Sequence, residues 1–198
     1  MTAQYYRVGP ILWPAVHRTV VVFDIEGFGD RRRTNRHQIV VRDGLYHTLE
    51  RAFERTHIRW SKCYHEDRGD GLFVLVPAEI PKSLFIDVLP TELADALNEH
   101  NCAHCPEERI RLRMALHAGE VSYDHHGVTA AAITLAFRLV NAPSLKAALA
   151  ESTGELALIT SPWFFDEVVR NSAASSPGSY YPTEVVMKET RTVGWIRQ

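Results

Sequence analysis

The stretch Thr19-Val-Val-Val-Phe-Asp-Ile25 decides the fold, because a short β-branched and aromatic run of this kind predicts a strand buried on both faces. Asp24 stands inside this apolar run, where an unpaired charge is expensive to bury. Gly27 and Gly29 follow it. Glycines let the backbone approach a ligand closely, and successive N–H groups can cradle a phosphate. The stretch therefore predicts a central strand that ends on a functional carboxylate.

Strand and helix patterns alternate outward from this strand. Apolar residues at helical spacing predict a helix over residues 35–56, with Gly44 as its weak point. Two strands, over residues 60–65 and 72–76, flank a hairpin turn at residues 67–71. The later expected elements are a helix over 82–101 with a candidate break at Pro90, a strand over 110–121, a helix over 130–150 interrupted at Pro143, a strand over 155–160, a helix over 163–170 and a closing hairpin over 182–198.

The order of these elements predicts an α+β fold. We expect a ferredoxin-like βαββαβ palm with additional C-terminal αβ elements, and helices packed on one face of the sheet. The 198 residues are enough for one domain with a sizeable hydrophobic core, which we expect over residues 19–160.

Composition and charge exclude several classes of protein. The chain is 45% hydrophobic and 23% charged, which is typical of a soluble globular protein, and its net charge of −2 favours neither nucleic acid nor a membrane as a partner. Residues 1–10 are too polar for a secretory signal, and three cysteines cannot form a complete disulfide framework. We therefore expect reduced thiols and a cytoplasmic location.

A second carboxylate, Asp70, occupies the tip of the expected hairpin between Gly69 and Gly71. In a βαββ sheet the end of the first strand and the tip of the following hairpin can lie side by side, which would bring Asp24 and Asp70 together. Two carboxylates there would form a hard oxygen site for Mg²⁺ and a triphosphate. The alternative is that Asp70 is an ordinary turn residue, since Asp-Gly is common in hairpins.

Four segments in the same order resemble the motifs of the class III nucleotidyl cyclases, the adenylyl and guanylyl cyclase family. They are Phe23-Asp-Ile-Glu-Gly-Phe-Gly29, Gly69-Asp-Gly-Leu-Phe-Val74, Arg113-Met-Ala-Leu-His-Ala-Gly-Glu-Val121 and Leu135-Ala-Phe-Arg-Leu139. The resemblance implies the palm fold described above. It also implies conversion of a ribonucleoside triphosphate to the 3′,5′-cyclic monophosphate and pyrophosphate. A polymerase-like palm shares the two carboxylates but does not explain the third segment.

In this family two ions, Mg²⁺ or Mn²⁺, bridge two aspartates and the substrate phosphates. By resemblance, Asp24 and Asp70 are the metal ligands, assisted by the carbonyl of Ile25. The backbone of Phe28 and Gly29 would contact phosphate, although Gly29 replaces a family threonine. The basic residues 31–33 could help to neutralise the triphosphate, or could form a solvated turn.

Family members are head-to-tail dimers with active sites at the interface, so a homodimer is expected. Arg138 corresponds to the arginine that stabilises the transition state from the other subunit. Lys188 lies near a phosphate-binding lysine position, although the family's glycine-rich lysine loop is absent. The family asparagine four residues before Arg138 is replaced by Thr134, whose hydroxyl can donate only one hydrogen bond. This replacement favours an alternative function, a degenerate domain that binds nucleotide or regulates a partner without turnover.

Two positions are expected to read the base. Glu66 occupies a site that holds lysine in adenylyl cyclases and glutamate in guanylyl cyclases. An ionised carboxylate accepts from guanine N1–H or uracil N3–H, so GTP or a pyrimidine triphosphate such as UTP is favoured over ATP. Asp124 takes the second position if Gly127, rather than Ala130, corresponds to a family glycine. Some cyclases of this class make cyclic pyrimidine nucleotides in bacterial antiviral defence, and a compact chain with these residues is compatible with that role.

Two further groups of residues are a candidate zinc site and a histidine on a core strand. Cys102-Ala-His104-Cys105, with His100, has the spacing of half a zinc site. A second ligand pair is missing, so His125, His126 or Cys63 would have to fold nearby; a polar loop is the alternative. His117, on an expected core strand, is interpreted as a buried histidine with its hydrogen bonds satisfied.

Overall fold

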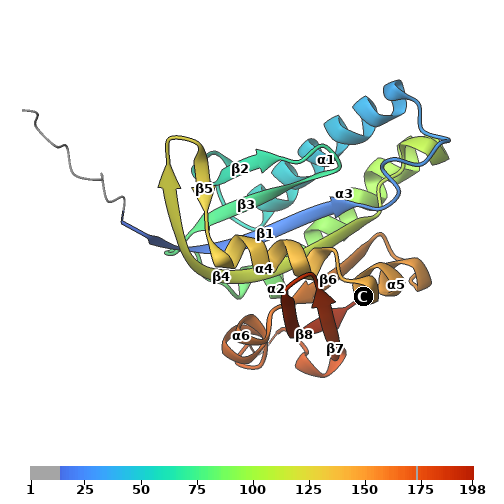
Figure 1. The fold of residues 1–198 in the computed structure, drawn as a ribbon. Coiled ribbons are helices and arrows are strands. Elements are labelled where there is room, and N and C mark those ends of the chain that lie inside the picture. The colour runs from blue at the N-terminus through green and yellow to red at the C-terminus, as the bar shows by residue number, and fades with distance from the viewer. Residues whose placement is uncertain (1–13, 173) are drawn as a thin grey trace, which may run out of the picture.

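Eight strands form one mixed sheet in the computed structural model, which describes residues 14–172 and 174–198 (Figure 1). The expectation for residues 1–10 lies outside these residues. The strand order is β2-β3-β1-β4-β6-β8-β7, and β5 pairs with β4. The strands are β1 (Val16–Ile25), β2 (Tyr64–Asp67), β3 (Gly71–Pro77), β4 (Leu112–Asp124), β5 (Gly127–Thr129), β6 (Leu156–Thr160), β7 (Tyr181–Met187) and β8 (Thr190–Arg197).

The ferredoxin-like palm predicted from the sequence is present. Strands β2, β3, β1 and β4 are antiparallel neighbours in that order, and β6 adds to β4 in the parallel direction. Between the palm strands run α1 (Asn35–Arg55), α2 (Leu84–Asp87) and α3 (Leu89–Ala103). The later helices are α4 (Ala131–Val140), α5 (Pro143–Glu151) and α6 (Pro162–Phe164), which continues as a π-helical turn, Phe165–Val169.

Helices cover both faces of the sheet, so the expectation of one helical face was wrong. Alternate residues of β1 enter two separate cores. Val21 and Phe23 pack against α1, α2, α3 and α6, whereas Val20 and Val22 pack against α4 and α5. In Figure 1, α4 crosses in front of the sheet and α1 and α3 lie behind it. Apolar periodicity along a helix shows that one side is buried, but not which face of the sheet receives it.

Several element boundaries also differ from expectation. Residues 60–62 form a short 3₁₀ turn, and the strand begins only at Tyr64. The break in the helix over 82–101 falls at Val88, and Pro90 sits in the first turn of α3, where its missing N–H costs nothing. The helix over 130–150 is two helices, with Pro143 opening α5 for the same reason. Strand β4 extends to Asp124 and turns back into β5.

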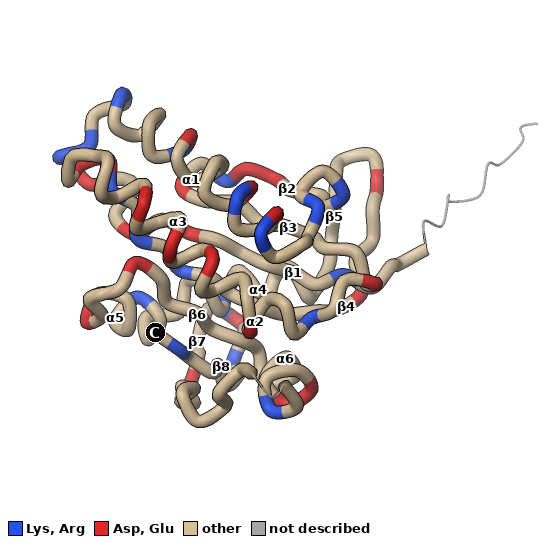
Figure 2. The backbone as a smooth tube through the Cα atoms, turned by 180° about the vertical axis from the view of Figure 1, so that it is seen from behind, with Lys and Arg blue, Asp and Glu red and all other residues tan. Residues whose placement is uncertain are grey.

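Gly44 has a packing role within α1. A Cβ at this position would overlap the imidazole ring of His100 on α3, so the glycine lets the two helices approach closely. Charged pairs cross the same junction, with Arg51 2.6 Å from Glu99 and Arg55 3.5 Å from Glu92. Figure 2 shows this side of the molecule, where α1 carries both basic and acidic residues and the charged residues of α3 are acidic.

Candidate active site

Asp24 and Asp70 lie side by side at one end of the palm. In the β1–β3 ladder Asp24 is opposite Gly71, and the Ile25 N–H donates to the Asp70 carbonyl oxygen at 2.8 Å. A Cβ on residue 71 would overlap the carbonyl oxygen of Phe23, so only glycine allows the strands to approach this closely. Asp24 and Asp70 are therefore neighbours at the end of the β1–β3 ladder, close enough for the Asp70 charge to act on the Asp24 carboxyl, and the glycine beside Asp70 explains how the two strands approach.

Arg113 of β4 forms an ion pair with Asp24, which is its direct neighbour in the β1–β4 ladder. The side chains are only 9% and 15% exposed, respectively. Burial raises the pKa of Asp24 above its usual range and the negative charge of Asp70 adds to this, while Arg113 and Lys146 of α5 oppose it. The Arg113 Nε atom is buried without a hydrogen-bond partner, which leaves one donor for an anionic ligand.

The turn after β1 exposes backbone beside these carboxylates. Gly27 adopts a left-handed φ of 61°, and the Asp30 N–H closes the turn on the Gly27 carbonyl oxygen at 3.0 Å. Phe28 packs partly buried against the core, and its carbonyl accepts from Gln38 of α1 at 3.2 Å. Gly29 is exposed, with open space where a side chain would stand. The turn is thus fixed by α1 and presents its outer backbone to a ligand.

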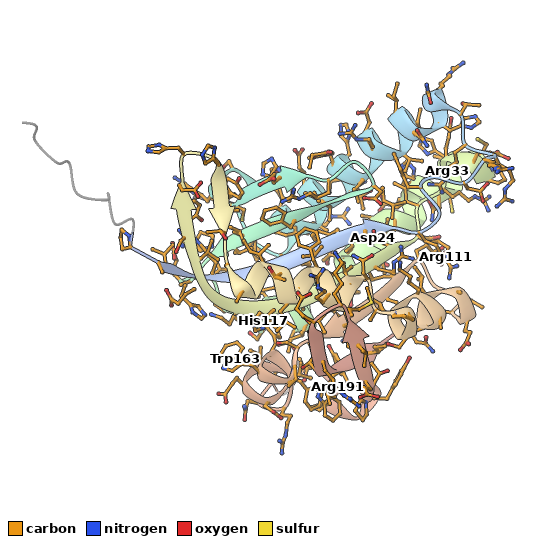
Figure 3. All side chains as sticks on the ribbon, in the orientation of Figure 1. Asp24, Arg33, Arg111, His117, Trp163 and Arg191 are labelled. Carbon is orange, nitrogen blue, oxygen red and sulfur yellow. The ribbon has the colours of Figure 1, made fainter. Side chains whose placement is uncertain are left out.

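Two of the three basic residues after this turn have local partners, although the Arg33 Nη1 atom is buried without one. Arg32 pairs with Asp30 at 2.8 Å, and the Arg33 Nη2 atom donates to the Arg109 carbonyl oxygen at 2.7 Å. Arg33 and Arg109 also line a cavity of about 460 Å³, which borders Gly27. Figure 3 shows Asp24, Arg111 and Arg33 at the same end of the molecule.

Glu66 faces the same side of the sheet as Asp24. It is opposite Phe73 in the β2–β3 ladder, and Phe73 is opposite Val22 in the β1–β3 ladder. The Val22 side chain lies in the core under α4, and Asp24, two residues further along β1, is on the same face of the sheet. One Glu66 oxygen accepts from the Tyr64 hydroxyl at 3.0 Å, and the other lies 3.0 Å from Arg68. The Arg68 guanidinium lies over the Phe73 ring, 5.0 Å from its centroid. Glu66 and Arg68 therefore present an acceptor and a donor next to each other.

Asp124 is carried toward the same region by the β4–β5 hairpin. The Tyr123 ring meets the Tyr64 ring edge-on, with centroids 6.0 Å apart, and a Cβ on Gly127 would be 3.8 Å from the Tyr64 hydroxyl. Asp124 itself accepts the His126 N–H at 2.7 Å. Of the two predicted base-reading residues, Glu66 bonds Tyr64 directly, whereas Asp124 follows Tyr123, whose ring meets that of Tyr64.

The remaining predicted site residues belong to α4 and the β7–β8 turn. Arg138 forms an ion pair with Glu189 at 2.9 Å, and the Thr134 hydroxyl donates to the Ala130 carbonyl at 3.3 Å. Lys188 is exposed at the turn, with a φ of 53°. Among the described residues, none of these three side chains bonds to Asp24 or Asp70 in the same chain.

Sequence reasoning missed Arg68, Tyr64 and Lys146. Arg68 could have been found, because Glu66 and Arg68 flank Asp67 at the entry to the hairpin turn and opposite charges at that spacing can pair. Lys146 carries no such signal. Its position near Asp24 depends on where α5 packs, and that is fixed by tertiary contacts.

The predicted half zinc site is not assembled as expected. The His104 Nδ1–H donates to the His100 carbonyl oxygen at 2.7 Å, and the Cys102 thiol lies 3.7 Å from the Asn98 side-chain oxygen. Cys63 is buried elsewhere, between β2 and the 3₁₀ turn. His117 is largely buried and lies 2.7 Å from the Ser161 hydroxyl, as a satisfied core histidine should, and burial lowers its pKa to about 4.

No protein-family model matches this chain, and no curated protein sequence matches it. Solved structures do. The guanylyl cyclase Cya2 is 16% identical with a TM-score of 0.63, and the match covers 93% of this chain and 92% of that one. The adenylate/guanylate cyclase/hydrolase from Silicibacter pomeroyi is 14% identical with a TM-score of 0.65, and the match covers 94% of this chain and 98% of that one. The guanylate cyclase domain of RhGC from Catenaria anguillulae, solved in complex with GTP, is 14% identical with a TM-score of 0.57, and the match covers 92% of this chain and 96% of that one.

The chain therefore has the fold of the adenylyl and guanylyl cyclase catalytic domains, as the four sequence motifs implied. The likeness extends over more than nine-tenths of the chain. Within the residues that the structure describes, no helix has the length and apolar character needed to cross a membrane.

Proposed function

We propose that this protein is a nucleotidyl cyclase. It would convert a ribonucleoside triphosphate to its 3′,5′-cyclic monophosphate: the ribose 3′ oxygen attacks the α-phosphorus, and pyrophosphate leaves. The observation that carries this proposal is the pairing of Asp24 with Asp70 at one end of a cyclase fold, beside a buried arginine. The solved neighbours support it, since their names describe guanylyl and adenylyl cyclases.

The residues at this end of the palm fit divalent cations. Two carboxylates and the Ile25 carbonyl offer only oxygen ligands, which suit Mg²⁺ and Mn²⁺. Asp24 is mostly buried, and burial raises its pKa, so a divalent cation beside it would stabilise the ionised carboxylate. Two such ions would activate the 3′ hydroxyl and neutralise the developing charge.

The chain's own donors would hold the phosphates. The backbone of Phe28 and Gly29 lies exposed in a turn that α1 fixes, and the Arg113 Nε atom is buried without a partner. A phosphate oxygen can accept from both, and an unpartnered buried donor gains more from such a bond than an exposed one.

Base recognition is proposed for Glu66 together with Arg68. Guanine and uracil each carry a ring N–H next to a carbonyl oxygen, and the Glu66–Arg68 pair offers an acceptor next to a donor. Adenine and cytosine lack that N–H. This supports GTP or UTP over ATP. Asp124 adds a second acceptor from the β4–β5 hairpin.

We propose that the working unit is a head-to-tail homodimer. In the described part of the chain, Arg138, Thr134 and Lys188 form no hydrogen bond or ion pair with Asp24, so they would act on the site of the partner subunit. The Arg138 ion pair to Glu189 does not prevent this, because Glu189 is 69% exposed and such pairs contribute little. A role in antiviral defence and a cytoplasmic location stay predictions from the sequence.

One observation favours the alternative, a domain that binds nucleotide without turnover. The Thr134 hydroxyl is already bonded to the Ala130 carbonyl of its own helix, so it is not free to replace the amide of the family asparagine. This domain would still bind nucleotide at the Asp24 end.

The deciding experiment incubates the full chain with each of the four ribonucleoside triphosphates, with Mn²⁺ and separately with Mg²⁺, and measures cyclic product by mass spectrometry. Asp24→Asn is the matched inactive variant. Cyclic product from wild type alone supports the cyclase. Metal-dependent nucleotide binding without product supports the alternative, and neither product nor binding rejects both.

A further inference from the structure

A second group of metal-ligating side chains lies where α1 begins and α3 ends. His37, Cys105 and Glu108 each offer one ligand atom, and these atoms all lie within 4.8 Å of one another. In the described part of the chain this is the one such group of three drawn from histidine, cysteine, aspartate and glutamate. We propose that it is a zinc-binding site, separate from the carboxylates of the proposed active site.

Backbone and side-chain bonds hold these ligands in position. Cys105 and Glu108 belong to one short turn, η2 (Pro106–Glu108) and its cap, which the Glu108 N–H closes on the Cys105 carbonyl at 2.9 Å. The buried Asn101 side chain binds both the N–H and the carbonyl of Ile110, at 2.7 and 2.8 Å. The loop that carries two of the ligands is therefore fixed at both ends.

The third ligand approaches from α1. His37 is the third residue of that helix, and the preceding Arg33 donates to the Arg109 carbonyl at 2.7 Å. This bond ties the start of α1 to the loop that holds Cys105 and Glu108. The three ligands thus come from two segments that already touch.

The donor set selects zinc. A thiolate, an imidazole and a carboxylate are the zinc ligands of proteins, whereas Mg²⁺ takes oxygen almost exclusively. Ligand atoms in a tetrahedral zinc site are about 3.5 Å apart, so closure requires movements of roughly 1 Å. Cys105 is exposed and free to make such a movement. Three protein ligands leave the fourth position for water.

Binding competes with one existing hydrogen bond. The His37 Nδ1 atom accepts the Thr34 N–H at 3.3 Å, as part of the cap of α1. A zinc ion at Nδ1 replaces this bond directly, and a zinc ion at Nε2 moves the ring proton to Nδ1, which ends it too. The bond is long and exposed, so its loss is small beside three metal–ligand bonds.

Zinc at this site would brace the neighbouring cavity. Pro106, Glu107 and Arg109 line the cavity of about 460 Å³ opposite Gly27 and Arg33. The ion would join the loop that lines this cavity to the first turn of α1, which begins two residues after Arg33. It would thereby stiffen the surroundings of the turn that carries Phe28 and Gly29.

The test measures metal binding to the full, untagged chain under reducing conditions. Protein stripped with a chelator is dialysed against Zn²⁺, and the bound metal is counted by mass spectrometry; Co²⁺ then reports a thiolate ligand by its charge-transfer absorption. We expect one zinc per wild-type chain. Cys105→Ser and His37→Gln should each weaken zinc binding at least about tenfold, since even outer-shell changes cost about 10–100-fold.

Cys102→Ser is the matched control, because Cys102 is also exposed and lies three residues away but contacts Asn98 instead. It should bind zinc like wild type. Asp24→Asn should also keep the zinc, so the failure of this proposal and that of the cyclase proposal are distinguishable. Less than one zinc per wild-type chain, or equal binding by Cys105→Ser and Cys102→Ser, overturns the proposal. Circular dichroism of each variant confirms that its fold is retained.

Discussion

Replacing Glu66 by lysine should shift the base preference toward ATP. Guanine N1–H or uracil N3–H would then face an ammonium group in place of a carboxylate, and Arg68, 3.0 Å from the native carboxylate, would repel the new charge toward the base. Leaving a buried donor unpaired costs about 1–3 kcal/mol, and about 1.4 kcal/mol corresponds to a factor of ten. The ratio of kcat/KM for the preferred triphosphate over ATP should therefore fall roughly tenfold or more.

The fold should survive this change. The Glu66–Arg68 pair is about half exposed, and pairs of that kind contribute about 0–1 kcal/mol to the free energy of unfolding. Kinetics with all four triphosphates give the preference, and thermal unfolding checks stability. Glu99→Lys is the control, since it also breaks a pair with an arginine, Arg51 at 2.6 Å, but on the opposite face of the sheet. Fastest turnover of ATP by wild type, or an unchanged preference in Glu66→Lys, would show that Glu66 does not read the base.

Three further predictions concern the dimer, the close approach at Gly71 and the buried His117. Asp24→Asn and Arg138→Ala should each be inactive alone, but an equal mixture should regain about a quarter of wild-type activity. About half of the dimers in that mixture are heterodimers, and a two-fold assembly gives each of these one intact site out of two. No recovery in a mixture shown to exchange subunits contradicts the head-to-tail dimer. Gly71→Ala should lower the free energy of unfolding by about 1–3 kcal/mol and abolish activity, because the added Cβ would overlap the Phe23 carbonyl oxygen. A urea titration measures the loss of stability. An unfolding midpoint equal to that of wild type would refute the close approach of the two strands. His117, whose pKa burial lowers to about 4, stays neutral in the fold while the unfolded chain takes up a proton below about 6.5. Its stabilisation is therefore present above pH 6.5 and lost toward pH 4, by up to about 1.4 kcal/mol per pH unit, and His117→Gln should flatten this dependence.

The sequence was informative where a local pattern determines structure. The apolar run at residues 19–25 and the helical stripe at 35–56 were placed within a few residues, because periodicity and burial are properties of the segment itself. The meeting of Asp24 and Asp70 was also predictable, since a βαββ order leaves few ways to arrange three neighbouring strands.

Features that depend on distant contacts were not predictable. The assignment of α4 and α5 to a second face requires knowledge of tertiary packing. The interaction between Tyr64 and Tyr123 joins residues 59 positions apart and depends on how the β4–β5 hairpin curls. The sequence grouped Cys105 with its near neighbours Cys102 and His104, but the structure places Cys105 near His37. These two residues are far apart in the chain, and no ligand-spacing pattern connects them.

The buried pair of Asp24 and Arg113 links two binding events at the proposed active site. The carboxylate cannot serve the arginine and a cation fully at once, so a cation that takes Asp24 leaves a buried guanidinium in need of another anion. A phosphate supplies that anion. Cation and nucleotide should therefore bind cooperatively, and each must raise the affinity for the other by the same factor. Without a cation or a nucleotide, the carboxylate and the guanidinium neutralise each other, so neither charge is buried alone.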